Sequence, residues 1–197
     1  DERTGLIHDF TRKDGVAHSE ILSNLDIEID RGELWNLAEK TENRKDARTA
    51  REWVIALPDE LDADQRKDLA KDFARSLVDR YGVIADLAIH EPSKGGNDKN
   101  HHAHIMLTTR EIGPEGFGAK NRDWNAKELL VDWRSSWAEH VNRTLERCSV
   151  YERVDHRTLE AQRAVALERA HAAERRGDER THVAEMARAV ELDRPPL

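Results

Sequence analysis

Two short apolar runs, Val83-Ile-Ala-Asp-Leu-Ala-Ile-His90 and His102-Ala-His-Ile-Met-Leu-Thr-Thr109, lie near the middle of the chain and decide its fold. Each run has the length and the residue types of a β-strand. The loop between them is polar and contains glycine, asparagine and aspartate. Two strands joined by such a loop predict an antiparallel hairpin.

Further strand and helix signals lie on both sides of this hairpin. The runs Val16–Leu22 and Trp53–Leu57 each predict a strand. Capping signals predict three helices. The first follows Asp30 and covers about 31–47, the second runs from Asp62 to Gly82, and the third begins at Asn125, with Glu128 as its capping partner. The glycine-rich segment 113–123 is expected to be irregular. This order predicts an α+β fold, with a small antiparallel or mixed sheet and helices on one side.

The last part of the chain differs in composition from the rest. From about Thr158 onward it is rich in alanine, arginine and glutamate, and it is interrupted near Gly177. We expect two solvated helical segments there and no second globular domain. The predicted organisation is therefore one domain over 1–156 and a charged helical extension over 157–197.

Composition excludes several classes of protein. The chain has 197 residues, a formal net charge of −8, and no apolar run near the length of about 18 residues that spans a bilayer. Cys148 is the only cysteine, which excludes an intrachain disulfide and a cysteine-cluster metal site, and which fits the reducing cytoplasm best. The acidic total argues against a protein that coats nucleic acid indiscriminately.

Histidines concentrate at the predicted hairpin, where four of the ten fall between positions 90 and 104. Side chains alternate along a strand, so His102 and His104 point to the same face. His90 ends the preceding strand, and pairing brings it next to them, about 5 Å away. Three neutral imidazoles can hold one divalent ion with open coordination positions, and the uncompensated charge of that ion favours a phosphate oxygen.

Two carboxylates lie near these histidines in the expected strands. Glu52 and Asp86 could each orient an imidazole through its second nitrogen, or act as a general base. A plain surface carboxylate is the alternative for both.

An ordered series of motifs resembles the MobA/MobL family of relaxases, which includes the N-terminal domains of TraA-type conjugation proteins. The resemblance runs from Asp1 to about Gln162. It rests on Asp1-Glu-Arg-Thr-Gly5, His8-Asp-Phe-Thr-Arg-Lys13, Arg51-Glu52 with Ala56-Leu57-Pro58, Ala88-Ile-His90-Glu-Pro92, His102-Ala-His104-Ile-Met-Leu-Thr-Thr-Arg110, Gly116-Phe-Gly118, Arg122-Asp-Trp124 and Val154-Asp-His156-Arg.

The resemblance implies an HUH-type endonuclease that nicks one strand at a plasmid origin of transfer. His90, His102 and His104 match the ligand positions that hold Mg²⁺ or Mn²⁺, with Zn²⁺ a less suitable ion, and Glu52 matches an acidic position. It also implies single-stranded origin DNA as substrate, accessory relaxosome proteins and a coupling protein as partners, and a bacterial cytoplasmic location.

The nucleophile of this family is a tyrosine that lies just before the stretch matching Asp1. Tyr81 and Tyr151 are the two tyrosines of the chain, and packing is the expected role of both. We therefore expect this chain to lack the tyrosine segment that carries the nucleophile, so that these residues alone bind DNA and metal without nicking.

Basic residues near the motifs are the candidates for contact with DNA, and these are Arg12, Lys13, Arg48, Arg51, Arg110, Lys120 and Arg122. Two other functions stay open at this point. One is a non-catalytic module that binds single-stranded DNA through a metal, and the other is an unrelated zinc hydrolase in which three imidazoles activate water.

Overall fold

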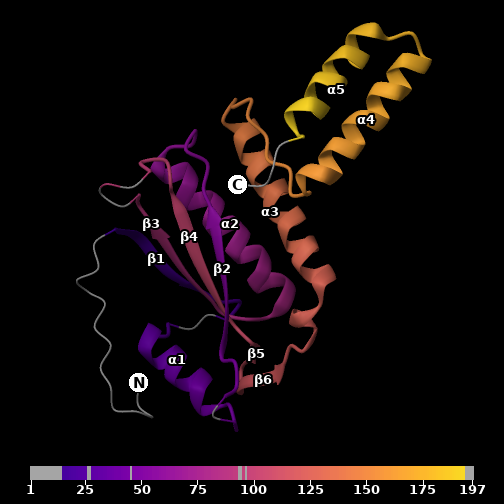
Figure 1. Ribbon diagram of the computed structural model, residues 1–197. Coiled ribbons are helices and arrows are strands. Elements are labelled where there is room, and N and C mark those ends of the chain that lie inside the picture. The colour runs from indigo at the N-terminus through magenta and orange to yellow at the C-terminus, as the bar shows by residue number, and fades with distance from the viewer. Residues whose placement is uncertain (1–14, 26–27, 45, 93–94, 96, 194–197) are drawn as a thin grey trace.

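Four strands form the central sheet of the protein (Figure 1). The computed structural model describes residues 15–25, 28–44, 46–92, 95 and 97–193. The strands are β1 (Val16–Leu22), β2 (Ala50–Ala56), β3 (Ala85–His90) and β4 (His102–Thr108), in the order β1-β3-β4-β2. All three pairings are antiparallel, and the β3-β4 hairpin occupies the middle of the sheet. The predicted α+β fold with an antiparallel sheet is confirmed.

Two long helices, α2 (Ala63–Tyr81) and α3 (Lys127–Arg147), cover one face of this sheet. The start of α2 is a complete capping box between Asp62 and Gln65, and its end is Gly82 in the left-handed conformation, as the sequence predicts. Phe73 on α2 and Trp133 on α3 are almost fully buried against the sheet. The core therefore lies between the sheet and these two helices.

Alternation along β4 separates the two faces of the sheet. Ala103, Ile105 and Leu107 are fully buried and face the helices. His102 and His104 consequently point to the opposite face. A register shift of one residue would exchange the two sets, so burial of the apolar set fixes the direction of the histidines.

The short helix α1 (Arg31–Lys40) differs from its predicted length of 31–47. It begins after Asp30 as expected, because the Asp30 carboxylate accepts hydrogen bonds from the amides of Gly32 and Glu33. It ends early because the chain turns at Thr41, whose hydroxyl donates to the carbonyl of Leu37.

Segment 113–123, predicted to be irregular, contributes to a second antiparallel pair, β5 (Arg110–Gly113) and β6 (Gly116–Lys120). Gly116 has a φ of 103°, so the glycines serve the turn of a hairpin. The predicted start of the third helix at Asn125 was also wrong. Asn125 belongs to a short 3₁₀ turn, η1 (Asp123–Asn125), and α3 follows Ala126 without a side-chain cap.

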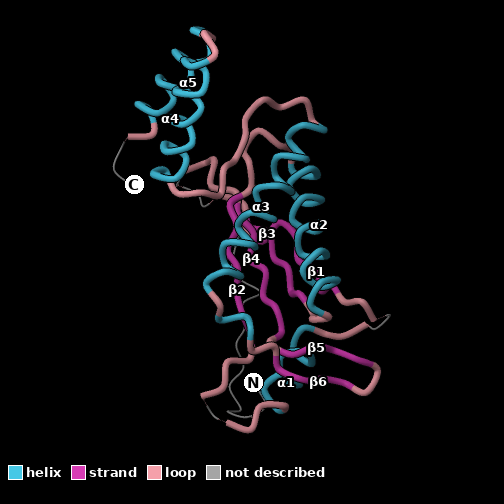
Figure 2. Tube along the Cα trace, turned by 90° about the vertical axis from the view of Figure 1, so that its right-hand side faces the viewer, coloured by secondary structure: helices cyan, strands magenta, loops and turns pink. Residues whose placement is uncertain are grey.

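The C-terminal part forms two helices, α4 (Leu159–Arg175) and α5 (Glu179–Glu191), which pack against each other through alanines. Figures 1 and 2 show this pair projecting away from the sheet. Within the described part of the chain, none of the helices has both the length and the apolar character needed to cross a membrane.

Candidate metal centre

Three imidazoles gather at one end of the central hairpin, on the face that α2 and α3 leave open. His90 and His102 are direct cross-strand partners, and His104 lies opposite Ala88. The ring centroids are 5.2 Å apart for His90 and His102, 4.9 Å for His90 and His104, and 5.4 Å for His102 and His104. The structure thus brings together all three histidines selected from the sequence.

Hydrogen bonds orient two of the three rings. The Nδ1 atom of His104 lies 2.7 Å from Oε1 of Glu52, and Nδ1 of His102 lies 2.9 Å from the carbonyl oxygen of Asn100. A carboxylate or a carbonyl can only accept, so the ring nitrogen must be the donor in each pair. Each neutral ring then keeps its lone pair on Nε2, the arrangement that metal-binding histidines use.

The chemistry of these donors fits a divalent ion, although the rings are not yet arranged around one. In the described part of the chain, no group of three or more His, Cys, Asp or Glu side chains has the geometry of a ready ligand set. The rings of His90 and His102 are stacked, with an interplanar angle of 26°. Binding of one ion by all three imidazoles therefore requires their side chains to turn.

Access to the cluster is open. The side chain of His104 is 33% exposed and that of Glu52 is 50% exposed. The neighbouring edge strand β2 presents Val54 to solvent on the same face, opposite His104. A large substrate such as a nucleic acid strand can therefore approach the imidazoles without opening the core.

The structure gives Asp86 a different setting from Glu52. Asp86 is buried, and its carboxylate accepts one hydrogen bond from Nε of Arg31 that both oxygens share, one from Nη2 of Arg31 and one from the indole of Trp35. These bonds raise the pKa of the Arg31 guanidinium. Asp86 therefore fastens α1 to the histidine face of the sheet. Arg31 and Trp35 had no signal in the sequence, because only the packing of α1 brings them to Asp86.

His101 lies apart from the three-histidine cluster. Its side chain is nearly buried, with Nδ1 3.4 Å from a Glu91 oxygen and Nε2 3.6 Å from an Asp59 oxygen. Alternation along the strand directs it away from His102.

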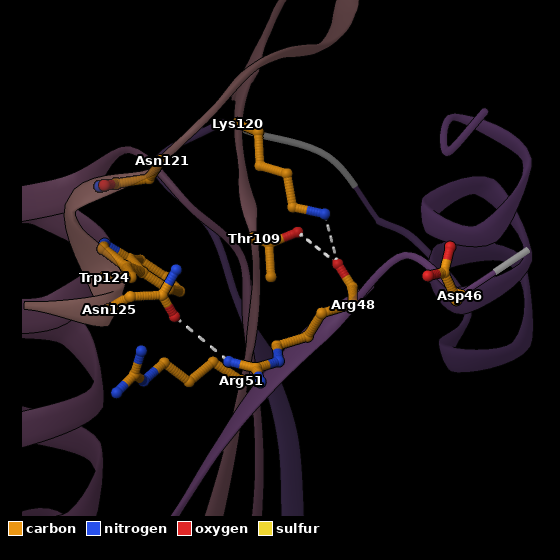
Figure 3. A pocket seen from close by; sticks show the side chains of 8 residues that line it. All are labelled: Asp46, Arg48, Arg51, Thr109, Lys120, Asn121, Trp124 and Asn125. Carbon is orange, nitrogen blue, oxygen red and sulfur yellow. Dashed lines mark hydrogen bonds between the residues drawn. The ribbon is translucent and has the colours of Figure 1, made fainter. Parts of the chain in front are cut away.

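The candidate DNA-binding residues occupy several settings. Arg48, Arg51 and Lys120 line one pocket beside the start of β2, drawn in Figure 3. Arg110 donates to Glu42 and to the carbonyl of Gly118, whereas Arg122 is exposed. Arg12 and Lys13 lie outside the described residues.

Comparison with known proteins identifies the relatives of this chain. A model of the MobA/MobL family matches residues 1–176. Mobilization protein MobL of Acidithiobacillus ferridurans is 41% identical over 85% of this chain and 52% of that protein. Conjugal transfer protein TraA of Rhizobium radiobacter is 31% identical over 82% of this chain and 17% of that protein. The chain thus spans about half of the first relative and a smaller part of the second.

Solved structures show the same architecture. A structure from work on the molecular basis of vancomycin resistance transfer in Staphylococcus aureus is 37% identical, with a TM-score of 0.64, over 72% of this chain and 76% of that chain. The conjugative relaxase TrwC, in a metal-bound complex with OriT DNA, has a TM-score of 0.54 over 91% of both chains. At 14% identity, the likeness to TrwC shows a shared fold.

Proposed function

The chain belongs to the MobA/MobL family, and we propose that it is the DNA-nicking part of a mobilization relaxase, acting on one strand at a plasmid origin of transfer. The observation that carries this proposal is the cluster of His90, His102 and His104 on the open face of the antiparallel sheet. The activity of the whole protein, its accessory proteins and its coupling protein are part of the same proposal.

In this proposal the three imidazoles hold Mg²⁺ or Mn²⁺. When bound, such an ion supplies Lewis-acid polarisation of the scissile phosphate. Glu52 holds the Nδ1 proton of His104 and so keeps Nε2 as the donor atom, as the carbonyl of Asn100 does for His102. Because the three ligands are neutral, they do not offset the positive charge that attracts the phosphate.

The proposed reaction is a transesterification. A tyrosine hydroxyl attacks phosphorus, the new O–P bond forms, and the P–O3′ bond breaks. The tyrosine loses its proton to a base or water, the leaving 3′ oxygen gains one, and the 5′ phosphate stays on the tyrosine for later rejoining. The proposal assigns this role to neither described tyrosine. The Tyr81 hydroxyl accepts a hydrogen bond from Trp133, and its ring packs against the core as expected. The expected packing role of Tyr151 was wrong, because this side chain is 93% exposed beyond α3.

We also propose that residues 1–156 form the relaxase domain and that 157–197 form a helical extension. The helices α4 and α5 pack on each other and project from the sheet (Figure 1). None of the proposed metal or DNA contacts lies on them.

Metal binding by this chain tests the proposed site directly. Titration with Mn²⁺, followed by calorimetry, should show one ion per chain. His104→Ala should weaken binding at least about 10-fold and leave the far-UV circular dichroism unchanged. The matched control is His171→Ala on α4, an exposed histidine, which should bind as the wild type does. Equal Mn²⁺ affinity in His104→Ala and wild type would refute the site.

Nicking by the full-length protein tests the reaction. With Mn²⁺ and a supercoiled plasmid carrying its origin, we expect open circles whose 5′ end is covalently attached to protein. A free 5′ phosphate would favour a water-activating hydrolase. Binding of the origin strand without any cleavage would favour a non-catalytic module.

A further inference from the structure

A second site lies at the other end of the central strands, in a pocket of about 250 Å³. We call it the Arg48 pocket, and its lining residues are Asp46, Arg48, Arg51, Thr109, Lys120, Asn121, Trp124 and Asn125. Figure 3 shows that these side chains come from the chain before and within β2, from the chain next to β4, from the end of β6 and from the turn before α3. Four segments that are distant in sequence therefore build it.

The cations of this pocket exceed its anions. Lys120 forms an ion pair with Glu42, with 3.1 Å between Nζ and Oε1. Asp46 forms an ion pair with Arg44, which lies outside the pocket, with 2.7 Å between Oδ2 and Nη2. No carboxylate among the described residues forms an ion pair with Arg48 or Arg51 within the 4.0 Å limit of such pairs. Neither arginine thus has a carboxylate in direct contact among the described residues, and Asp46 is the one acidic side chain of the described lining.

The protein holds these arginines in place. The carbonyl of Arg48 accepts hydrogen bonds from Nζ of Lys120 at 2.6 Å and from the hydroxyl of Thr109 at 3.2 Å. Its guanidinium donates to the Asn125 side chain at 3.4 Å, and the Arg51 guanidinium lies over the Trp133 ring at 5.8 Å. Burial and the charge of Arg48 lower the pKa of Arg51, which indicates that like charges are kept close together.

Trp124 also forms part of the wall of this cavity and is 3% exposed. Its indole Nε1 is buried without a hydrogen-bond partner among the described residues, so the arginines and Lys120 supply the donors that face the open space. A lining with excess positive charge suits an anion with several acceptor oxygens.

The position of the pocket relates it to the metal centre. Thr109 lies five residues beyond His104, on the order of 17 Å along the strand. Glu52 contacts His104 on the open face of β2, whereas the adjacent Arg51 points to the other face and lies over Trp133 of α3. The pocket therefore lies beyond the histidines along the strands, on the side of the sheet that α3 covers.

Resting on the proposed function, we propose that the Arg48 pocket binds a non-scissile phosphodiester group of the DNA strand whose scissile phosphate lies at the three histidines. Arg48 and Arg51 supply the charge, and the pocket holds the strand at a point away from the reacting phosphate. These residues are positioning residues, since they do not touch the reacting phosphate.

The test uses fluorescein-labelled dodecathymidylate and the 197-residue chain, with fluorescence anisotropy measured over a range of NaCl concentrations. The double variant Arg48→Gln with Arg51→Gln should bind at least about 10-fold more weakly at low salt. Its slope of log K against log salt should be shallower by about 0.7 for each lost phosphate contact. The matched control, Arg175→Gln with Arg180→Gln on the exposed helical hairpin, removes the same charge and should leave the slope unchanged.

Two further measurements keep the test decisive. The double variant removes Arg51 from the Trp133 ring and could disturb the core. The single variant Arg48→Gln changes only an exposed side chain, so it should fold, and it should make the salt slope shallower in the same direction. A dodecamer with a neutral methylphosphonate backbone should bind wild type and variants equally.

The outcomes separate the two proposals. If the wild type binds the dodecamer and the arginine variants bind it with the same affinity and slope, the pocket assignment is overturned and the relaxase proposal stands. A penalty that persists on the neutral backbone would also overturn it, because the pocket would then contact a base. If the wild type does not bind the dodecamer at any salt concentration, the pocket assignment is overturned, whereas the relaxase proposal is decided by nicking of the origin plasmid.

Discussion

Replacing Asp86 with alanine should destabilise the protein by about 2 kcal/mol, because this carboxylate joins α1 to the sheet. It is 7% exposed and accepts from Trp35 at 2.9 Å and from two nitrogens of Arg31 at 2.7 to 3.0 Å. The indole bond to a buried carboxylate contributes about 1 kcal/mol. The Arg31 side chain is 47% exposed and regains water when the partner is removed, so its pair adds only about 1 kcal/mol more.

Urea unfolding measures this loss. With a slope near 2 kcal/mol per molar urea, about 2 kcal/mol lowers the midpoint by about 1 M. Asp86→Asn should lose about half as much, since its amide oxygen still accepts from one donor. Asp79→Ala, at an exposed position on α2, is the matched control and should change stability by less than about 0.5 kcal/mol. An Asp86→Ala midpoint equal to that of the control would refute the reasoning, and so would a double-mutant cycle with Arg31→Ala that shows no coupling.

Two further predictions concern other carboxylates. Glu52→Gln should weaken Mn²⁺ binding about 10-fold with little loss of stability, because the amide holds the His104 ring less firmly than the carboxylate does. Calorimetric titration with Mn²⁺ measures this change, with Glu139→Gln as the control. An unchanged Mn²⁺ affinity in Glu52→Gln would contradict the prediction. The Arg157 side chain lowers the pKa of Asp155 from 3.8 to about 2. This stabilisation is therefore fully present above pH 4 and is lost as the pH falls through 2, so the stability difference between wild type and Asp155→Asn should shrink over that interval in urea titrations. A difference that stays constant from pH 5 to pH 2 would count against this ion pair.

The sequence predicts an element well where the signals that begin and end it are local. The helix α2 carries a capping box at Asp62 and a terminal Gly82, and both serve as expected. The hairpin β3-β4 is predicted by two apolar runs and the polar loop between them. The end of α1 and the pair β5-β6 lack such signals. The turn at Thr41 and the pairing of Arg110 with Lys120 depend on local contacts that periodicity does not encode.

The same distinction between local and non-local signals applies to the candidate site. The grouping of His90, His102 and His104 follows from strand alternation and hairpin pairing, which the sequence contains. The sequence does not separate the roles of Glu52 and Asp86, because both lie on the same face of the sheet. Two non-local facts separate them. The order of the strands brings Glu52 to His104, and the packing of α1 brings Arg31 and Trp35 to Asp86.

The two faces of β4 connect stability to the proposed chemistry. Ala103, Ile105 and Leu107 are fully buried on one face, and each lies next to a residue that points to the open face. Hydrophobic burial thus selects a single register, and that register alone turns His102 and His104 toward His90 and Glu52. The imidazoles can remain exposed and polar because the apolar residues between them supply the folding energy. Substitutions on the buried face should therefore disturb metal binding only when they alter the register of the sheet, whereas substitutions on the open face can remove metal binding and leave the fold intact.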